Sequence, residues 1–255
     1  MKLATFNANS VRTRMPVIIN WLQKENPDVL CLQETKVQDK DFPAGPFEEA
    51  GYHIIYRGQK SYNGVAIASK ESATQIRYDL YEQGDEQARF ISAVINNISI
   101  INVYVPQGFA VDSEKFEYKL LWLRELFSFI KERYNSGDPL IISGDFNIAL
   151  TPGDVYDPET LEGEVGFHPL ERALMREILD WGLIDIFRKY HRADAHYTFW
   201  DYRIPNALKR KMGWRIDYIL TTKSLAEESL DSWIDTEPRS GPKPSDHTFL
   251  IAEFK

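Results

Sequence analysis

The chain has 255 residues and a formal charge of −8 at pH 7, with 43% hydrophobic and 27% charged residues. This composition is typical of a soluble globular protein, and residues 1–255 are expected to form a single domain. One cysteine, Cys31, excludes an internal disulfide and fits a reducing compartment, so we expect a cytoplasmic location. No apolar run is long enough to span a bilayer, so no membrane partner is expected. The acidic total argues mildly against a nucleic-acid ligand, although local basic patches can coexist with it.

Predicted strands and helices alternate along the chain. Strands are expected at Leu3 to Phe6, Asp28 to Leu32, Tyr52 to Tyr56, Gly64 to Ala68, Phe90 to Ile95, Ser99 to Val105, Leu140 to Ser143, Tyr197 to Tyr202, Trp214 to Leu220 and Phe249 to Phe254. Helices are expected at Thr13 to Gln23, from Ser113 as N-cap to Arg133, and at Leu170 to Trp181. This alternation predicts an α/β fold with two packed sheets.

The stretch from Leu140 to Asn147 changes from a buried strand to polar groups within a few residues. Gly144 allows a sharp turn, and Asp145 and Asn147 follow it two residues apart. A lone motif of this kind is usually a turn. A carboxylate and an amide at the end of a buried strand are nevertheless well placed for a ligand site, because open α/β sheets bind ligands beyond the carboxyl ends of their strands.

Polar side chains follow apolar strands at several other places in the chain, which favours one ligand site over a set of isolated turns. Polar side chains at strand ends are Asn7, Asn9, Glu34, Tyr104, Asp145, Asn147, Asp246 and His247, and Asp217 lies inside an apolar strand. Carboxylate and amide oxygens are hard ligands that prefer Mg²⁺ or Mn²⁺ to Zn²⁺. The chain has no Gly-x-Ser-x-Gly motif and no Gly-rich phosphate loop, so no nucleotide cofactor is expected. Of the reaction classes compared, metal-assisted attack of water on a phosphoester is the one that these residues fit.

These residues lie in motifs that resemble those of the exonuclease III family of AP endonucleases. The motifs, in order, are Thr5-Phe6-Asn7-Ala8-Asn9, Leu32-Gln33-Glu34-Thr35-Lys36, Tyr104-Val105-Pro106-Gln107-Gly108, Gly144-Asp145-Phe146-Asn147, Gly213-Trp214-Arg215-Ile216-Asp217-Tyr218 and Ser245-Asp246-His247. The resemblance spans essentially the whole chain. It implies a four-layer α-β-β-α sandwich of the DNase I-like kind, with two mixed β-sheets face to face. The implied activity is cleavage of duplex DNA 5′ to an abasic site, leaving a 3′-hydroxyl, often with 3′→5′ exonuclease activity and removal of 3′ blocking groups.

The resemblance also implies a metal site and a base. Glu34 resembles the principal ligand of Mg²⁺, with Mn²⁺ as a substitute, and Asn9 and Asp246 lie near it. Asp145 resembles the group that orients and deprotonates the attacking water.

The remaining catalytic roles follow from the same resemblance. Asn7 and Asn147 would position the base and the nucleophile. His247 would hydrogen-bond the phosphate, with Asp217 fixing its tautomer. Tyr104 would donate to the same phosphate.

Two groups of residues are candidates for DNA contact. Phe199, Trp214 and Ile216 are expected either to form a pocket for the flipped abasic sugar or to be core aromatic and aliphatic residues. A local basic or polar surface is expected from Lys36, Gln107, Arg203, Lys209, Arg210, Lys211 and Arg215, although the run from Lys209 to Lys211 also fits a solvated loop.

Two alternatives and one departure stay open at this point. The chain could be a phosphodiesterase of the wider superfamily, acting on a phosphoinositide or sphingomyelin, or a nucleic-acid-binding regulator that has lost catalysis. Ser10 stands where the family usually has glycine, so that turn is expected to differ in shape. No coiled coil or exposed apolar repeat is evident, and a monomer is expected.

Overall fold

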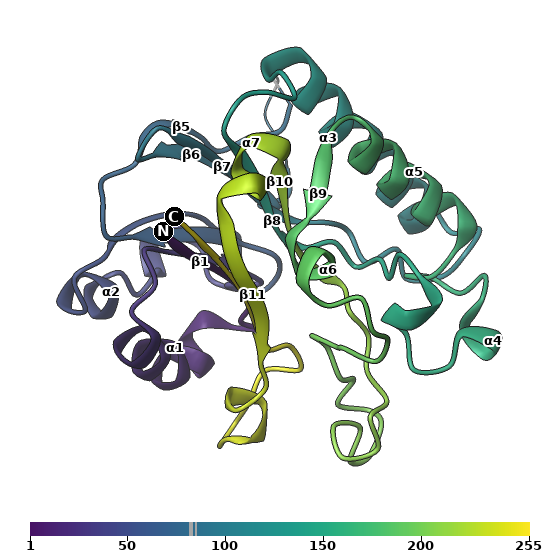
Figure 1. The fold of residues 1–255 in the computed structure, drawn as a ribbon. Coiled ribbons are helices and arrows are strands. Elements are labelled where there is room, and N and C mark those ends of the chain that lie inside the picture. The colour runs from purple at the N-terminus through teal and green to yellow at the C-terminus, as the bar shows by residue number, and fades with distance from the viewer. Residues whose placement is uncertain (82–83, 85) are drawn as a thin grey trace.

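The computed structural model describes residues 1–81, 84 and 86–255, which form two mixed six-stranded sheets (Figure 1). Sheet A has the strand order β11-β12-β1-β2-β4-β3, and sheet B has the order β5-β6-β7-β8-β10-β9. The strands of sheet A are β1 (Lys2–Asn7), β2 (Val29–Gln33), β3 (His53–Arg57), β4 (Val65–Ser69), β11 (Ser229–Asp235) and β12 (Phe249–Phe254). Those of sheet B are β5 (Thr74–Arg77), β6 (Phe90–Ile95), β7 (Ile98–Tyr104), β8 (Leu140–Asp145), β9 (Leu183–Asp185) and β10 (Asp217–Thr222).

The helices are α1 (Val11–Glu25), α2 (Gly45–Glu49), α3 (Glu114–Arg133), α4 (Pro158–Leu161), α5 (Pro169–Asp180), α6 (Ile186–Tyr190) and α7 (Lys223–Glu228), with 3₁₀ turns η1 (Asp39–Asp41), η2 (Pro152–Asp154) and η3 (Pro238–Ser240). Helices α1, α3 and α5 cover the outer faces of the sheets, whereas α6 and α7 pack onto the apolar layer between them. None of the helices in the described part of the chain combines the length and apolarity that a membrane span requires.

Three apolar layers hold these elements together. The layer between the sheets includes Cys31, Ile141 and Leu250, all fully buried. The layer outside sheet A packs α1 against its strands, and the layer outside sheet B packs α3 and α5 against theirs. Figure 1 shows α1 and α2 on one side of the molecule and α3 and α5 on the other. The predicted four-layer sandwich is confirmed.

The two sheets share one arrangement of strand directions. In sheet A, β1 and β2 are parallel and β12 and β4 flank them in antiparallel pairing. In sheet B, β7 and β8 are parallel and β6 and β10 flank them in the same way. The carboxyl ends of the parallel strands and the beginnings of β10 and β12 therefore meet at one edge of the sandwich, where the polar strand-end residues lie.

Gly144 has a different role from the one its motif indicated. It lies inside β8, with φ of 142°, instead of making a turn. A Cβ atom at this position would lie 2.0 Å from the carbonyl oxygen of Val103 on the neighbouring β7. Glycine is needed here because the two backbones approach closely.

Two strand predictions were wrong at the same place. Residues 197–202 form no strand, and Phe199 makes only isolated bridges to Trp214 and His247. The aromatic side chains of this stretch point to different clusters: Tyr197 and Trp200 pack together, whereas Phe199 packs beside Trp214. Strand β10 begins only at Asp217, so this carboxylate lies at the start of a strand and not at its centre.

Candidate active site

Asp145 lies at the carboxyl end of β8, and both of its carboxylate oxygens accept hydrogen bonds. Asn7 Nδ2 donates to Oδ2 over 2.8 Å, and the backbone N–H of Asn147 donates to Oδ1 over 2.8 Å. The Asn147 side chain donates in turn to the carbonyl of Val105 over 3.0 Å. Burial raises the pKa of Asp145 to about 7, against the opposing effect of His247. A carboxylate of this kind is fixed in direction and is a strong enough base to accept a proton near neutral pH.

His247 lies beside Asp145 and is oriented by a second buried carboxylate. Its Nδ1 is 2.8 Å from Oδ2 of Asp217, and its Nε2 is 3.7 Å from Oδ2 of Asp145. Burial disfavours the charged ring, but Asp217 and Asp145 outweigh it and raise the pKa of His247 to about 10. The ring is therefore cationic at neutral pH and can donate from Nε2 into the pocket.

Two of the predicted metal ligands, Glu34 and Asn9, contact a cation in this structure, the ammonium group of Lys36, and the third, Asp246, is hydrogen-bonded to Asn9. Lys36 Nζ lies 2.8 Å from Oε2 of Glu34 and 2.5 Å from Oδ1 of Asn9. Asn9 Nδ2 donates to Oδ1 of Asp246 over 3.0 Å, and Asn7 Nδ2 donates to Oε1 of Glu34 over 2.9 Å. The donor set is made of carboxylate and amide oxygens and already attracts positive charge, so it fits a hard divalent cation.

A second group of potential ligands overlaps the base. Asp145, Asp217 and His247 each offer one ligand atom, and these atoms lie within 4.8 Å of one another, so this buried group could hold a metal ion. The Nδ1 atom of its imidazole already hydrogen-bonds Asp217, so Nε2 is the ring nitrogen that this group offers to a metal ion.

Tyr104 supplies a neutral donor between the two ends of the site. Burial, and then the charges of Glu34 and Asp145, raise its pKa well above the usual value. The phenol therefore keeps its proton, and it hydrogen-bonds the Glu34 carboxylate.

A pocket of about 430 Å³ opens over these groups. Phe199, Trp214 and Ile216 line one wall of it, with Gly166 beside them. The same three side chains also pack onto an apolar cluster that includes Phe167. Each of the three therefore belongs to an apolar cluster and also lines the pocket, and their role as a pocket for the flipped abasic sugar stays a prediction.

Not every predicted DNA-contact residue faces the pocket. Gln107 and Arg203 line it, and the Arg203 side chain is 90% exposed, with an ion pair of 2.6 Å to Asp201. The prediction that Arg215 belongs to the basic surface was wrong. This residue is fully buried, with ion pairs of 2.6 Å to Asp154 and 2.8 Å to Asp185, because its neighbours in the motif point to the opposite side of the chain.

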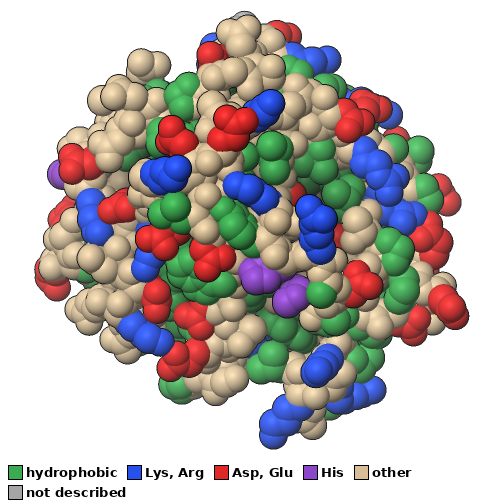
Figure 2. Space-filling model, viewed as in Figure 1, with side chains coloured by type: hydrophobic (Ala, Val, Ile, Leu, Met, Phe, Trp, Pro, Cys, Tyr) green, Lys and Arg blue, Asp and Glu red, His purple; other side chains and the backbone are tan. Residues whose placement is uncertain are grey.

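The run Lys209 to Lys211 lies on an exposed loop outside the pocket lining. Figure 2 shows Lys and Arg side chains gathered at the lower end of the molecule, where the loop between α6 and β10 lies in Figure 1. This placement fits a solvated loop and also a contact beyond the pocket.

Several residues of the candidate site have backbone in the left-handed region, as do residues of turns elsewhere in the chain. Asn9, Glu34, Lys36 and Asn147 have φ between 44° and 53°, and Ser10 has φ of 92°. Residues other than glycine are held in the left-handed region only where their surroundings require it, and such positions concentrate at functional sites.

Some residues of the site were missed from the sequence. Phe109 and Asp201 line the pocket, and the Phe109 side chain is exposed. Ser245 Oγ donates to the carbonyl of Asn7 over 2.8 Å and so joins the last motif to the first. An aromatic residue directly after Pro106-Gln107-Gly108 was the available signal for Phe109.

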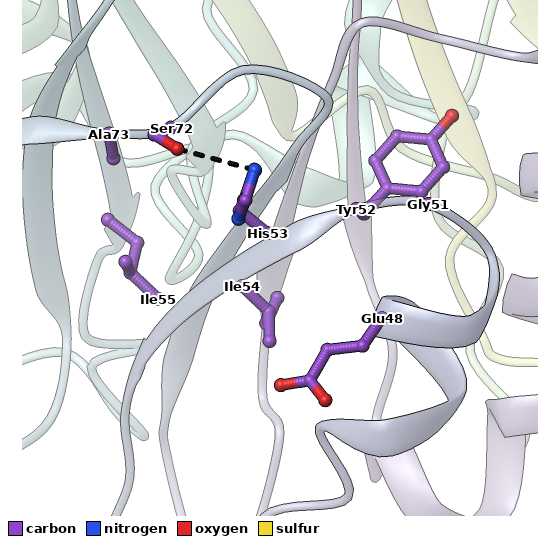
Figure 3. A pocket seen from close by; sticks show the side chains of 8 residues that line it. All are labelled: Glu48, Gly51, Tyr52, His53, Ile54, Ile55, Ser72 and Ala73. Carbon is purple, nitrogen blue, oxygen red and sulfur yellow. Dashed lines mark hydrogen bonds between the residues drawn. The ribbon is translucent and has the colours of Figure 1, made fainter.

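A larger cavity of about 620 Å³ lies elsewhere, along the outer strand β3 (Figure 3). Glu48 and His53 line it, and Figure 3 shows His53 pointing to Ser72, at 3.3 Å from Nε2 to Oγ. It contains none of the strand-end residues of the catalytic pocket, so size alone does not locate the site.

Comparison with known proteins agrees with this geometry. The profile of the Endonuclease/Exonuclease/phosphatase family matches residues 4–247. "Exodeoxyribonuclease III" of Haemophilus influenzae is 35% identical over 268 residues, covering 100% of both chains. The structure of an AP endonuclease from Archaeoglobus fulgidus is 44% identical with a TM-score of 0.97, covering 100% of this chain and 99% of that one. The 3′ phosphatase NExo from Neisseria, solved with a product DNA hairpin, is 38% identical with a TM-score of 0.97 and the same coverage.

The chain therefore belongs to the endonuclease/exonuclease/phosphatase family. Within that family its relatives are exodeoxyribonucleases and AP endonucleases, which confirms the predicted resemblance and the predicted class of enzyme.

Proposed function

We propose that this protein is a DNA repair nuclease that hydrolyses the phosphodiester bond 5′ to an abasic site in duplex DNA. Asp145 accepts a proton from water while the water oxygen bonds to phosphorus. The bond from phosphorus to the 3′ oxygen breaks, and that oxygen takes a proton from solvent and becomes the new 3′-hydroxyl. The same step performed at a 3′ end gives 3′→5′ exonuclease activity and removal of 3′ blocking groups.

The observation that carries this proposal is the placement of Asp145 between two different kinds of partner. Amide groups of Asn7 and Asn147 hold both carboxylate oxygens, and the cationic ring of His247 lies at 3.7 Å. A directed base therefore lies beside a cation-binding cluster at Glu34, since Asn7 Nδ2 donates to both carboxylates. Metal-assisted attack of water on a phosphodiester uses such a base and cation close together.

We assign the metal position to Glu34, Asn9 and Asp246, and the ion to Mg²⁺, for which Mn²⁺ substitutes. When bound there, the ion supplies positive charge to the phosphate and to the departing 3′ oxygen. His247 and Tyr104 donate hydrogen bonds to the phosphate oxygens from the other side, and Asn147 positions the water.

The apolar wall of the pocket provides selectivity. Phe199, Trp214 and Ile216 fit a sugar without a base, which leaves the helix at little stacking cost. Gln107 and Arg203 lie on the rim, where they can contact the DNA backbone.

The proposed partner is duplex DNA that contains abasic or 3′-blocked sites, bound by a monomer of one domain, residues 1–255, in the cytoplasm. The solved relatives support DNA as substrate: one is an AP endonuclease, and another is a 3′ phosphatase bound to a product DNA hairpin.

The test is incision of a duplex with one abasic-site analogue, in Mg²⁺ and then in EDTA, with Glu34→Ala beside the wild type and Glu227→Ala, an exposed glutamate outside the pocket lining, as a matched surface control. We expect metal-dependent incision 5′ to the lesion, lost in Glu34→Ala and retained in Glu227→Ala. Hydrolysis of a soluble inositol phosphate instead of the duplex would show the superfamily alternative. Tight DNA binding without incision would show the regulator.

A further inference from the structure

Lys119 and Glu171 form an ion pair that no part of the proposed chemistry uses. Lys119 Nζ and Glu171 Oε1 are 2.5 Å apart, and both side chains are fully buried. Lys119 lies on α3 and Glu171 lies in the first turn of α5, so the pair joins the two helices outside sheet B. Burying two charges carries a large desolvation cost, and a well-packed apolar pair would serve the helix interface at least as well. The pair therefore calls for an explanation beyond helix packing.

The remaining contacts of the ammonium group go to the walls of the catalytic pocket. Lys119 Nζ donates to the carbonyl of Asn147 over 2.7 Å and to the carbonyl of Gln107 over 3.2 Å. With Glu171, these oxygens match its three N–H donors. Gly108 packs on the lysine stem, since a Cβ atom there would lie 3.2 Å from Lys119 Cδ.

The Glu171 carboxylate binds further backbone groups near the pocket. Glu171 Oε2 accepts from the backbone N–H of Gly166 over 2.8 Å and from that of His168 over 3.1 Å. Gln107, Asn147 and Gly166 all line the catalytic pocket. One buried ion pair thus fixes three chain segments that meet around the substrate position but are far apart in the sequence.

Of the three segments that the ion pair contacts, the one at Asn147 is linked most directly to Asp145. Its backbone has φ of 52°, and its N–H is the donor that holds Asp145 Oδ1. A peptide in this conformation needs an external partner to keep it, and its carbonyl finds that partner in Lys119.

We propose that Lys119 and Glu171 are positioning residues: they hold the Asn147 and Gly166 backbones at the pocket, and through Asn147 they set the direction of the Asp145 carboxylate. This inference rests on the proposed function, in which Asp145 is the base.

The test uses a double variant, Lys119→Met/Glu171→Gln, which keeps side-chain length and removes both charges. Thermal unfolding, kcat and KM on the abasic duplex, and hydrogen exchange of the Asn147 amide are measured. We expect kcat to fall by about 10–100-fold, because small displacements of a catalytic group are costly, while KM changes far less. Exchange at the Asn147 amide should become faster.

The matched control is Leu123→Ala, one turn further along α3, which removes a fully buried side chain of the same helix that does not line the pocket. It should lower the unfolding temperature and leave kcat and Asn147 exchange at wild-type values. A double variant that keeps both quantities at wild-type values would overturn the proposal, as would a control that loses kcat to the same extent.

The measurements also distinguish failure of the proposed function from failure of the positioning role, and a second variant covers the case in which the double variant does not fold. If the wild type does not cleave the duplex but Asn147 exchange still rises in the double variant, the proposed function fails and the positioning role stands. If the double variant does not fold, Glu171→Gln alone is measured. Faster exchange at the Gly166 amide with lower kcat then supports the proposal, and no change in either overturns it.

Discussion

Asn7 Nδ2 and Asp145 Oδ2 are joined by a hydrogen bond of 2.8 Å that crosses from the end of β1 in sheet A to the end of β8 in sheet B. Each sheet alone carries only part of the site. The candidate base is therefore aligned by the packing of the two sheets against each other, and its direction depends on the core between them.

Removing the charge of Asp145 should abolish most of the activity without unfolding the protein. We expect Asp145→Asn to lower the single-turnover rate of abasic-site incision by roughly 10²–10⁴, because the variant cannot accept a proton. A thermal melt serves as the control for folding. Incision near the wild-type rate would contradict the assignment of the base.

The His247–Asp217 contact should make stability depend on pH in the alkaline range. The folded pKa of His247 is raised from 6.5 to about 10, so its contribution is fully present below pH 6.5 and is lost as the pH rises toward 10. We expect the free energy of unfolding of the wild type, relative to His247→Gln, to decrease over this range. Urea titrations at a series of pH values would measure it, and a constant difference would refute the prediction.

Trp214 should matter more for the substrate than for the fold. We expect Trp214→Ala to raise KM for the abasic duplex strongly, since one wall of the pocket is removed, with a smaller loss of stability. Phe167→Ala is the comparison: Phe167 is fully buried in the same cluster but is not a pocket-lining residue, and truncation there should cost about 3–5 kcal/mol. Equal losses of binding and stability in Trp214→Ala would mark it as a core residue only.

Ser10 is strained, and glycine should relieve the strain. Its φ is 92°, and its side chain makes no capping hydrogen bond to α1. Ser10→Gly is expected to stabilise the protein by about 1 kcal/mol, a rise of about 2–4 °C in melting temperature. Ser113→Gly is the matched control, because Ser113 caps α3 with a real hydrogen bond to the Phe116 amide over 3.2 Å and should lose stability. A destabilised Ser10→Gly would show that the strain is compensated elsewhere.

Arg215 should contribute to stability and not to DNA binding. Arg215→Met removes the arginine paired with Asp185 and one of the two arginines paired with Asp154, which should cost about 3–5 kcal/mol. The salt dependence of DNA binding should stay the same, whereas each lysine that contacts a phosphate adds about one unit to the log–log slope. A reduced slope in Arg215→Met would contradict the buried position.

The strand-end residues were predictable because their signal is local. Asn7, Glu34 and Asp145 each follow an apolar run, and parallel strands bring such ends together whatever the rest of the chain does. Helix α3 was predictable for the same reason, since Ser113 and the apolar stripe after it lie within one segment.

The features that were missed depend on distant contacts. Arg215 has the same local pattern as a surface arginine, and only the position of Asp154 and Asp185 determines that it is buried. Strands β9 and β11 lie at the outer edges of their sheets, and their mixed exposure leaves little period-two pattern to detect. The backbone of Phe199 forms single β-bridges to Trp214 and to His247. Residue propensities do not predict isolated bridges of this kind, because they depend on distant parts of the chain.

Strand β12 pairs with β1 inside sheet A, and His247 lies two residues before β12, whereas Asn7 closes β1. The site therefore combines a side chain from the first strand of sheet A with one from the segment that leads into β12. We expect a chain under synthesis to be inactive until β12 has left the ribosome, because sheet A then lacks an inner strand and the pocket lacks its imidazole.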